Sequence, residues 1–429
     1  MQHAAPSKSS GRLTARIGIG LVLGIAVGFV GNHFAADAAH AKSLASNFTI
    51  VTDIFLRLIK MIIAPLVFAT IVSGIASFGN AKAVGGIAIR AMGWFVCASL
   101  VSLSLGLLFA NLFHPGAGLA LPLPDANAET GLAAASLNFR DFVTHVFPTS
   151  VVSAMAGNEV LQILVFAVFF GFAVAALPAA VAKPIIDLTD AVASAMFRVT
   201  DYVMKVAPFA VFAAMAAVVT VQGPGVLITY GKFIGAFYIG LAALWMVLLT
   251  AGRIVLGRDV WRLVGLLKEP MLLAFSTASS EAAFPKTIEK LDEFGVHERV
   301  TGFVLPLGYS FNLDGSMMYQ AFAALFIAQA FGIHMGFAEQ VSMLLVMMIA
   351  SKGIAGVPRA SLVVVAAVAP MFNLPAAGIL LIMGIDQILD MGRTLTNVLG
   401  NGLATAAVAK WQGEVDAEPE TEAAALAAA

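Results

Sequence analysis

Six long apolar runs dominate the first 255 residues of this chain. A helix needs about 20 apolar residues to cross the hydrocarbon core of a bilayer. Charged residues make up only 11% of the sequence, whereas soluble domains carry about 25%, so water cannot face most of this surface. The sequence therefore predicts an all-α membrane protein, whose first membrane helices lie near 15–34, 49–77, 91–113, 158–178, 195–220 and 229–252.

Basic residues next to these runs predict the orientation of the chain in the membrane. The region 114–139 contains acids but no Lys or Arg. An even number of runs separates the basic loops from one another, so these loops share one side, which the positive-inside rule identifies as the cytoplasm. Residues 1–14 are thus expected to form a cytoplasmic tail, followed by a retained helix rather than a cleaved signal peptide. The basic residues are Lys8, Arg12, Arg16, Lys82, Arg90, Arg253, Arg258, Arg262 and Lys268.

After residue 255 small and polar residues interrupt each apolar stretch near its middle. The interruptions lie in LLAFSTASSEAAFPK, PLGYSFNLDGSMMYQ and MMIASKGIAGVPRASLVVVA. Non-helical backbone is tolerated at membrane depth only where protein or a water-filled cavity satisfies it. Interrupted segments at corresponding places in two halves are typical of transporters with inverted repeats. The order of elements gives halves of 258–333 and 338–410, and the acidic, alanine-rich residues 411–429 are expected to be a disordered tail.

Polar residues line one face of the last apolar stretch, MGIDQILDMGRTLTNVLGN. Each ionised group costs about 2.5–3.5 kcal/mol at the centre of a span, so this face must meet a cavity or polar partners. One interpretation is a purely structural ion pair, either a salt bridge to another helix or a pair within the helix such as Asp390 with Arg393. The other is a ligand site, because a guanidinium binds carboxylates through paired donors and the carboxylate one turn earlier suits an ammonium. Both groups together suit glutamate or aspartate. At about 100° per residue, an arc of about 100° holds Asp386, Asp390, Arg393, Thr394, Asn397 and Asn401.

Several segments resemble the dicarboxylate/amino acid:cation symporters, in the order that the family has them. They are FLRLIKMIIAPLVF, STASSEAAFPK, NLDGS, SKGIAGVPRAS and GIDQILDMGRTLTNVLGN. The similarity extends from the first run to about Lys410 and is closest to the bacterial proton–glutamate/aspartate symporters. It implies a homotrimer in the bacterial inner membrane, with eight membrane helices and two re-entrant helical hairpins. Residues 15–255 would hold six of these helices, including the trimerisation scaffold, and residues 256–410 would form a transport core that moves like an elevator.

The resemblance also implies a substrate site, with glutamate or aspartate as the small-molecule partner. Arg393 would bind the side-chain carboxylate and Asp390 the amino group, whereas the dicarboxylate branch lacks an acid at the position of Asp390. The hairpin tips would lie at 278–282 and 353–361 and close on the substrate. Ser316 stands where the family usually has Thr. The remaining substrate-binding residues implied are Thr394, Asn397, Ser279, Ser280, Ser316 and main-chain groups near Val357.

The coupling ion is where the sequence departs from the sodium-driven members. Asn401 replaces an aspartate, and Phe95 and Ala98 replace a Tyr and a Thr that ligate sodium in those members. These losses favour protons as the coupling cation. Residual sodium sites would involve Asn312, Asp314 and Asn397. Further cation-coupling candidates are Gly308, Ser99, Asn401, Glu281 and Asp386.

Two alternatives stay open for the proton-carrying group. Glu281, at the first hairpin tip, would suit this role if it is buried without a partner, because burial raises a carboxyl pKa. It would have no such role if it is a solvated tip residue, and Asp386 is the next candidate. The family's mammalian branch has a titratable Glu where this chain has Gln320.

Other functions fit the sequence less well. Within transport, sodium coupling or a C4-dicarboxylate substrate are the alternatives. A membrane enzyme is disfavoured because HExxH, GxSxG and His or Cys pairs at metal-ligand spacing are absent, and no cofactor is expected. The net charge of −1 provides no basic surplus for nucleic acid, and the single Cys97 excludes an intramolecular disulfide.

Overall fold

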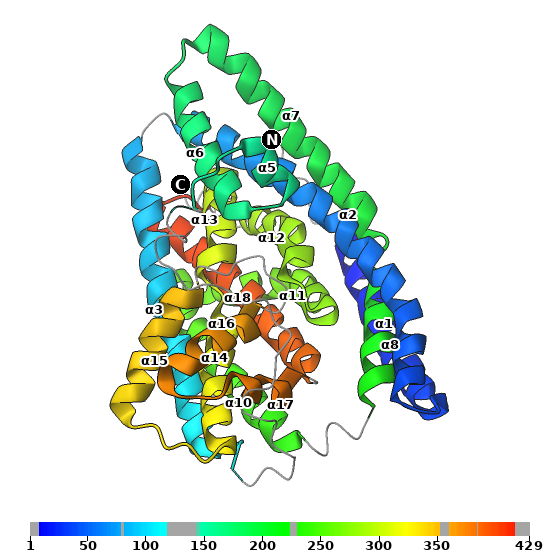
Figure 1. The fold of residues 1–429 in the computed structure, drawn as a ribbon. Helices are drawn as coiled ribbons and strands as arrows, with labels where there is room; N and C mark the ends of the chain where they lie inside the picture. The colour runs from blue at the N-terminus through cyan, green and yellow to red at the C-terminus, as the bar shows by residue number, and fades with distance from the viewer. Residues whose placement is uncertain are drawn as a thin grey trace.

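The computed structural model describes residues 8–78, 81–117, 144, 146–223, 230–351, 360–383 and 385–416. These residues are almost entirely helical and contain no strand, only an isolated bridge between Val296 and Val415 (Figure 1). The predicted all-α class is confirmed. The helices are α1 (Lys8–Phe34), α2 (Ala38–Phe78), α3 (Ala81–Phe113), α5 (Val151–Ala156), α6 (Val160–Ala175), α7 (Ala179–Met204), α8 (Ala207–Gln222), α10 (Gly231–Leu256), η1 (Gly257–Asp259), α11 (Val260–Thr277), α12 (Ser280–Phe294), α13 (Glu298–Phe311), α14 (Asp314–Ala330), α15 (Phe337–Ala350), α16 (Ala360–Val368), η3 (Ala369–Phe372), η4 (Ala376–Ile379), α17 (Leu380–Met383) and α18 (Asp386–Gln412).

Four helical segments of the described chain are long and apolar enough to cross a membrane: Ala15–Phe34, Ala38–Ala76, Val84–Phe113 and Gly231–Thr277. They contain the predicted runs at 15–34, 49–77 (save its last residue) and 91–113, and the run at 229–252 from residue 231 onward. The chain is therefore a multi-pass membrane protein. The predicted run at 158–178 corresponds to the shorter helix α6. A fifth span is counted if α7 and α8 are taken together.

The run predicted at 195–220 is wrong as a single helix. Helix α7 ends at Met204, α8 begins at Ala207, and their axes differ by 52°. Pro208 is the second residue of α8. A proline ring has no N–H to donate to the preceding turn and disfavours helical backbone in the residue before it. The proline therefore accounts for the break that apolar composition alone did not predict.

The helices form two groups. Helices α1, α2, α7 and α8 lie along one edge of the molecule, beside a more compact group that contains α10 to α18 (Figure 1). Within the first group α1 packs along α8, and α2 packs against α7 and α8. In the second group α18 contacts α10, α11, α13 and α14. Helix α18, which carries the polar face predicted from the sequence, thus lies inside a bundle. This explains why most of its residues are buried.

The first predicted hairpin tip is present as a break between two helices that pack against each other, α11 and α12. Ala278 has left-handed backbone, with φ of 48°. Ser279 then begins α12, because its hydroxyl accepts a hydrogen bond from the Ala282 N–H at 3.3 Å. A hydroxyl at this position satisfies one of the four N–H groups that a helix start leaves unpaired.

The interruption predicted in PLGYSFNLDGSMMYQ is also present. Asn312 and Leu313 separate α13 from α14. Helix α15 ends at Ala350 and α16 begins at Ala360, so the chain between them contains most of the second predicted tip. Val357, one of the predicted substrate-binding positions, lies outside the described residues.

The last described residues belong to the fold rather than to a disordered tail. Helix α18 extends to Gln412. The His297 N–H then donates to the Glu414 carbonyl at 3.1 Å, and the Asp416 N–H donates to the Gly295 carbonyl at 2.9 Å. The packed structure therefore extends past the boundary predicted at residue 411. Residues 417–429 lie outside the described part of the chain.

Candidate functional site

Arg393 is at the centre of the polar face of α18 and is only 1% exposed. Its Nη2 lies 3.0 Å from Asp386 Oδ1 and 2.8 Å from Asp390 Oδ1. Its Nε also donates to Asp390 Oδ1, at 3.1 Å. The structure thus brings together the three charged residues of the predicted polar face. Two carboxyl groups share one guanidinium.

Tyr319 is a member of this group that the sequence analysis missed. It is fully buried on α14, and the Arg393 guanidinium carbon lies 4.1 Å from the centre of its ring. Its hydroxyl donates to Asp386 Oδ1 at 3.5 Å. The available signal was its place in NLDGSMMYQ, one residue before Gln320 and five after Asp314. A cation over an aromatic face is attracted by the ring quadrupole, so Tyr319 holds Arg393 from the α14 side.

One nitrogen of the Arg393 guanidinium remains available to a hydrogen-bond acceptor. Among the described residues, Arg393 Nη1 has no hydrogen-bond partner. A buried donor left without an acceptor costs about 1–3 kcal/mol. Asp390, by contrast, is a third exposed. A carboxylate ligand would therefore find an unpaired guanidinium nitrogen beside an acid that a solute can reach.

Asn397 connects the polar face of α18 to the start of α14 through hydrogen bonds. Its side-chain oxygen accepts hydrogen bonds from the N–H groups of Gly315 and Ser316, at 2.9 and 3.3 Å, and its amide nitrogen donates to Ser316 Oγ at 3.1 Å. A Cβ on Gly315 would lie 2.5 Å from the Arg393 carbonyl oxygen, so only glycine permits this approach of the two backbones. The predicted residues Asn397 and Ser316 do come together. Both acceptor positions of the Asn397 oxygen are occupied, which does not favour it as a sodium ligand.

Thr394 has a local partner instead. Its hydroxyl donates to the Asp390 carbonyl one turn earlier on α18. This bond lies within the helix and restrains the hydroxyl beside Asp390.

A second polar cluster lies one turn further along α18. Asn312 Nδ2 donates to Asp314 Oδ2 at 3.1 Å and to Asn401 Oδ1 at 3.2 Å. Ser102 of α3, which the sequence analysis missed, donates to Asp314 Oδ1 at 3.4 Å. It lies one helical turn after the predicted residue Ser99, which is also buried. A Cβ on Gly308 would overlap the Asn401 side-chain oxygen, so glycine is required there.

This cluster contains oxygens that suit a hard cation. Asn312 Oδ1 is buried and has no hydrogen-bond partner among the described residues, and Asn401 Nδ2 is likewise unpaired. Sodium and similar ions prefer carboxylate and carbonyl oxygens. Yet Phe95, which is 1% exposed, and Ala98, which is 7% exposed, present no oxygen here, and Asn401 contributes an amide where a carboxylate would bring charge. The described residues contain no group of three His, Cys, Asp or Glu side chains placed to hold a metal ion.

Glu281 does not meet the condition attached to its prediction. Its side chain is 39% exposed, and Glu281 Oε2 lies 3.4 Å from Lys60 Nζ of α2. It is therefore neither buried nor without a partner, because it is in the first turn of α12 and faces the first group of helices. The prediction that burial would make it a proton carrier is wrong for this conformation. Lys60 was not identified from the sequence, since nothing local relates residues 60 and 281.

The two hairpin serines contribute differently. The Ser279 hydroxyl is engaged with the backbone of α12, and the Ser280 carbonyl accepts a hydrogen bond from the Tyr309 hydroxyl at 2.9 Å. Helix α12 also contacts α18. The tip of the hairpin formed by α11 and α12 is thus held against the neighbouring helix α13. The same hairpin packs against α18, the helix that carries the polar face.

Residues 13–411 match the model of the Sodium:dicarboxylate symporter family. The chain belongs to this family. It is therefore a transporter and not an enzyme, as the resemblance predicted, and the substrate of a symporter crosses the membrane together with a coupling ion.

Individual symporters of this family are similar along nearly the whole chain. The proton/sodium-glutamate symport protein of Bacillus subtilis is 37% identical over 408 residues, covering 94% of this chain and 93% of that protein. The proton/glutamate-aspartate symporter of Escherichia coli is 39% identical over 371 residues, or 85% of each chain. The C4-dicarboxylate transport protein of Rhodopseudomonas palustris is 42% identical over 404 residues, covering 92% of this chain and 87% of that protein.

Proposed function

We propose that this symporter imports acidic amino acids, glutamate or aspartate, together with protons. The observation that carries the proposal is the contact between Arg393 and Asp390. A cation and an anion one helical turn apart match the carboxylate and ammonium of an amino acid. The glutamate and glutamate–aspartate symporters that resemble this chain support the same substrate class.

The ion pairs in the structure suggest how the substrate is recognised. Without a substrate, Asp386 and Asp390 neutralise Arg393. A substrate carboxylate would take their place on the guanidinium, starting from the unpaired Nη1. Asp390 would then be free to bind the substrate ammonium. Arg393 and Asp390 each keep a partner of opposite charge during this exchange, which avoids the high cost of leaving either charge buried and unpaired.

The same exchange gives Asp386 a role in proton coupling. Asp386 is 3% exposed, and its ion-pair partner is Arg393. Once Arg393 turns to the substrate, Asp386 is a buried carboxylate without a cation, and uptake of a proton removes that charge. Substrate binding and protonation are then coupled. Because Glu281 is exposed and paired, we place the proton on Asp386.

Sodium is the second candidate for the coupling ion. It is favoured by the unpaired Asn312 oxygen beside the Asp314 carboxylate, and relatives are named for both ions. It is disfavoured by the apolar side chains of Phe95 and Ala98. A C4-dicarboxylate substrate is the alternative that the Rhodopseudomonas palustris relative raises. Asp390 disfavours it, because a dicarboxylate has no ammonium to neutralise that acid.

We extend the proposal to the architecture. Eight membrane helices and two re-entrant hairpins are part of it, and the break at Ala278 between α11 and α12 supports the first hairpin. The separate packing of α1, α2, α7 and α8 supports a scaffold beside a mobile transport core. An elevator motion, a homotrimer, an inner-membrane location and a cytoplasmic N-terminus complete the proposal.

Uptake into proteoliposomes tests both substrate and ion. Proton and sodium gradients are imposed separately, and labelled glutamate, aspartate and succinate are compared. We expect proton-driven accumulation of the amino acids without sodium. Asp390→Asn should reduce amino acid uptake at least about tenfold more than succinate uptake, since a charge-assisted hydrogen bond contributes about 1.5–3 kcal/mol. Equal losses would refute the ammonium role of Asp390, and strict sodium dependence at fixed pH would refute proton coupling.

A further inference from the structure

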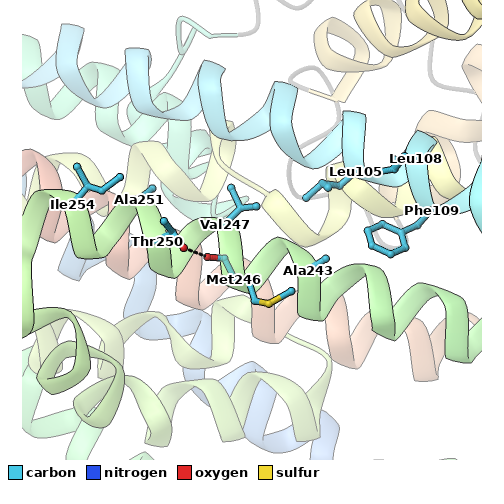
Figure 2. A pocket seen from close by; sticks show the side chains of 9 residues that line it. All are labelled: Leu105, Leu108, Phe109, Ala243, Met246, Val247, Thr250, Ala251 and Ile254. Carbon is cyan, nitrogen blue, oxygen red and sulfur yellow. Dashed lines mark hydrogen bonds between the residues drawn. The ribbon is translucent and has the colours of Figure 1, made fainter.

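An apolar groove of about 570 Å³ separates α3 from α10 on the outside of the second helix group. Figure 2 shows the side chains of the two helices that line it. The one polar residue among them, Thr250, donates its hydroxyl to the Met246 carbonyl at 2.6 Å and offers no free donor. Met246 and Ile254 are 65% and 79% exposed. The lining residues are Leu105, Leu108, Phe109, Ala243, Met246, Val247, Thr250, Ala251 and Ile254.

The groove has the length of one membrane leaflet. On α10 it extends from Ala243 to Ile254, which is about 16 Å at 1.5 Å per helical residue. The hydrocarbon core of a bilayer is about 30 Å thick. Because α10 lies in one of the segments long enough to span the membrane, the groove covers about half of its hydrocarbon depth.

In the described part of the chain, basic side chains lie at the end of the groove near Ile254. Arg253 directly precedes Ile254, and it is seven residues after Met246, so the two side chains share one side of α10. Arg258 follows in η1. Both arginines are exposed, and in the described chain neither side chain is engaged in a hydrogen bond or ion pair. With the exposed Asp259 included, this end of the groove carries a net positive charge.

The neighbouring arginines are engaged elsewhere. Arg90 of α3 donates to the Trp411 carbonyl, and Arg262 donates to the carbonyls of Phe294 and Glu293 at 3.3 and 3.2 Å. Arg253 and Arg258 are thus the cations available at the point where the groove reaches the membrane surface. Phospholipid headgroups with negative charge are attracted to basic residues at this depth.

We propose that the groove between α3 and α10 binds one anionic phospholipid, with an acyl chain along Ala243–Ile254 and the phosphate at Arg253 and Arg258. This inference rests on the multi-pass membrane fold and is independent of the proposed substrate. The opposite side of α10 holds the helix of the candidate site, since the Tyr238 hydroxyl donates to the Ile388 carbonyl at 2.7 Å and Trp245 Nε1 donates to Thr396 Oγ1 at 2.9 Å. A lipid in the groove would support α10 from outside while α10 contacts α18 on the inside.

Native mass spectrometry of the full chain tests the proposal. Purified protein is exposed to phosphatidylglycerol or to phosphatidylcholine with the same acyl chains, and the bound lipids are counted. We expect one phosphatidylglycerol retained at least tenfold more strongly than phosphatidylcholine. The double variant Arg253→Gln and Arg258→Gln should lose this preference, whereas Arg198→Gln, an exposed arginine on α7, should keep it.

A second variant tests the apolar groove independently of the two arginines at its end. Val247→Trp fills the groove from an exposed position and should remove the retained lipid of either type. Ile239→Trp, also exposed on α10 but outside the groove, is the matched control. Equal retention of both lipids by the unmodified protein would overturn the proposal, as would unchanged retention by Val247→Trp. A change of oligomeric state in Val247→Trp without loss of lipid would assign the groove to a second copy of the chain instead.

Discussion

The helix pair α1–α8 and the helix pair α14–α18 both pack closely, but by opposite means. Helix α1 meets α8 through glycines. A Cβ on Gly20 would lie 2.5 Å from the Pro208 carbonyl oxygen, and a Cβ on Gly24 would overlap that of Phe212. Helix α14 meets α18 through Asn397, Ser316 and the stack of Tyr319 on Arg393.

The difference follows from what lipid does and does not provide. Lipid tails are as apolar as the helix surfaces, so no hydrophobic force joins α1 to α8, and small residues that let backbones approach supply the packing instead. Such a contact allows the two helices a single closely packed arrangement. The α14–α18 contact contains charges that need partners, and a ligand can replace those partners. The α1–α8 pair is therefore suited to a fixed support. The α14–α18 pair is suited to a site whose charged groups change partners when a ligand binds.

The largest effect is expected where the glycine contact is removed. Gly24→Leu places a side chain against the α8 backbone, which cannot move aside as a side chain would, and over-packing costs about 1–3 kcal/mol or more. We expect a large loss of folded protein in detergent, measured by thermal unfolding and size-exclusion chromatography. Gly18→Leu on the same helix is the control, because its Cβ would meet nothing within 4 Å. Equal stability of the two variants would contradict the close packing of α1 and α8.

A large loss of transport is expected where the ion pair between Arg393 and Asp390 is broken. Arg393→Cys removes the group that would bind the substrate carboxylate, and glutamate uptake should fall at least about 100-fold, since two charge-assisted hydrogen bonds of about 1.5–3 kcal/mol each are lost. Neutral amino acids such as serine should be admitted, because the variant leaves no guanidinium that needs a carboxylate. Uptake of labelled glutamate and serine measures both effects. Undiminished glutamate uptake would remove Arg393 from recognition.

The two carboxylate candidates for proton coupling should differ. Asp386→Asn should abolish accumulation driven by a proton gradient but retain exchange of labelled for unlabelled glutamate, because exchange needs no net proton movement. Glu281→Gln should keep both activities, since this side chain is exposed and paired with Lys60. The reverse result, with accumulation lost only in Glu281→Gln, would show that the hairpin tip carries the proton in a conformation that buries it.

The smallest effect is expected at the half-buried cluster around His297. Its ring contacts Glu414 and Asp416 at 2.6 and 2.8 Å, and Arg299 also pairs with Glu414. Burial alone would lower the pKa of His297, but the hydrogen bonds to Asp416 and Glu414 outweigh burial and raise this pKa above its ordinary value of 6.5.

The sign of the pH dependence follows from this raised pKa. The cluster stabilises the fold fully below pH 6.5 and loses this contribution as the pH rises through the raised pKa. His297→Gln should therefore destabilise the protein more at pH 6 than at pH 8.5, by under about 1 kcal/mol, because water screens ion pairs at the surface. Thermal unfolding at the two pH values measures this, and a larger loss at the higher pH would contradict it.

The sequence by itself determined the membrane class, the helix breaks after α11 and α13, and the polar face of α18. These features are local. Apolar runs of sufficient length require lipid, small and hydroxyl residues such as Ser279 end one helix and begin the next, and the helical repeat places Asp386, Asp390 and Arg393 on one side. The family could be recognised for the same reason, because its motifs are short and continuous.

Only the tertiary structure decided which partners these residues have. The pattern around Arg393 did not reveal that Tyr319 covers its guanidinium, and nothing near Glu281 in the sequence indicates Lys60. Likewise, the acidic composition after residue 411 predicted disorder, whereas contacts with 295–297 hold residues 414–416 in place. Local composition fixes which groups need a partner, but the partner is supplied by the packing of helices that are far apart along the chain.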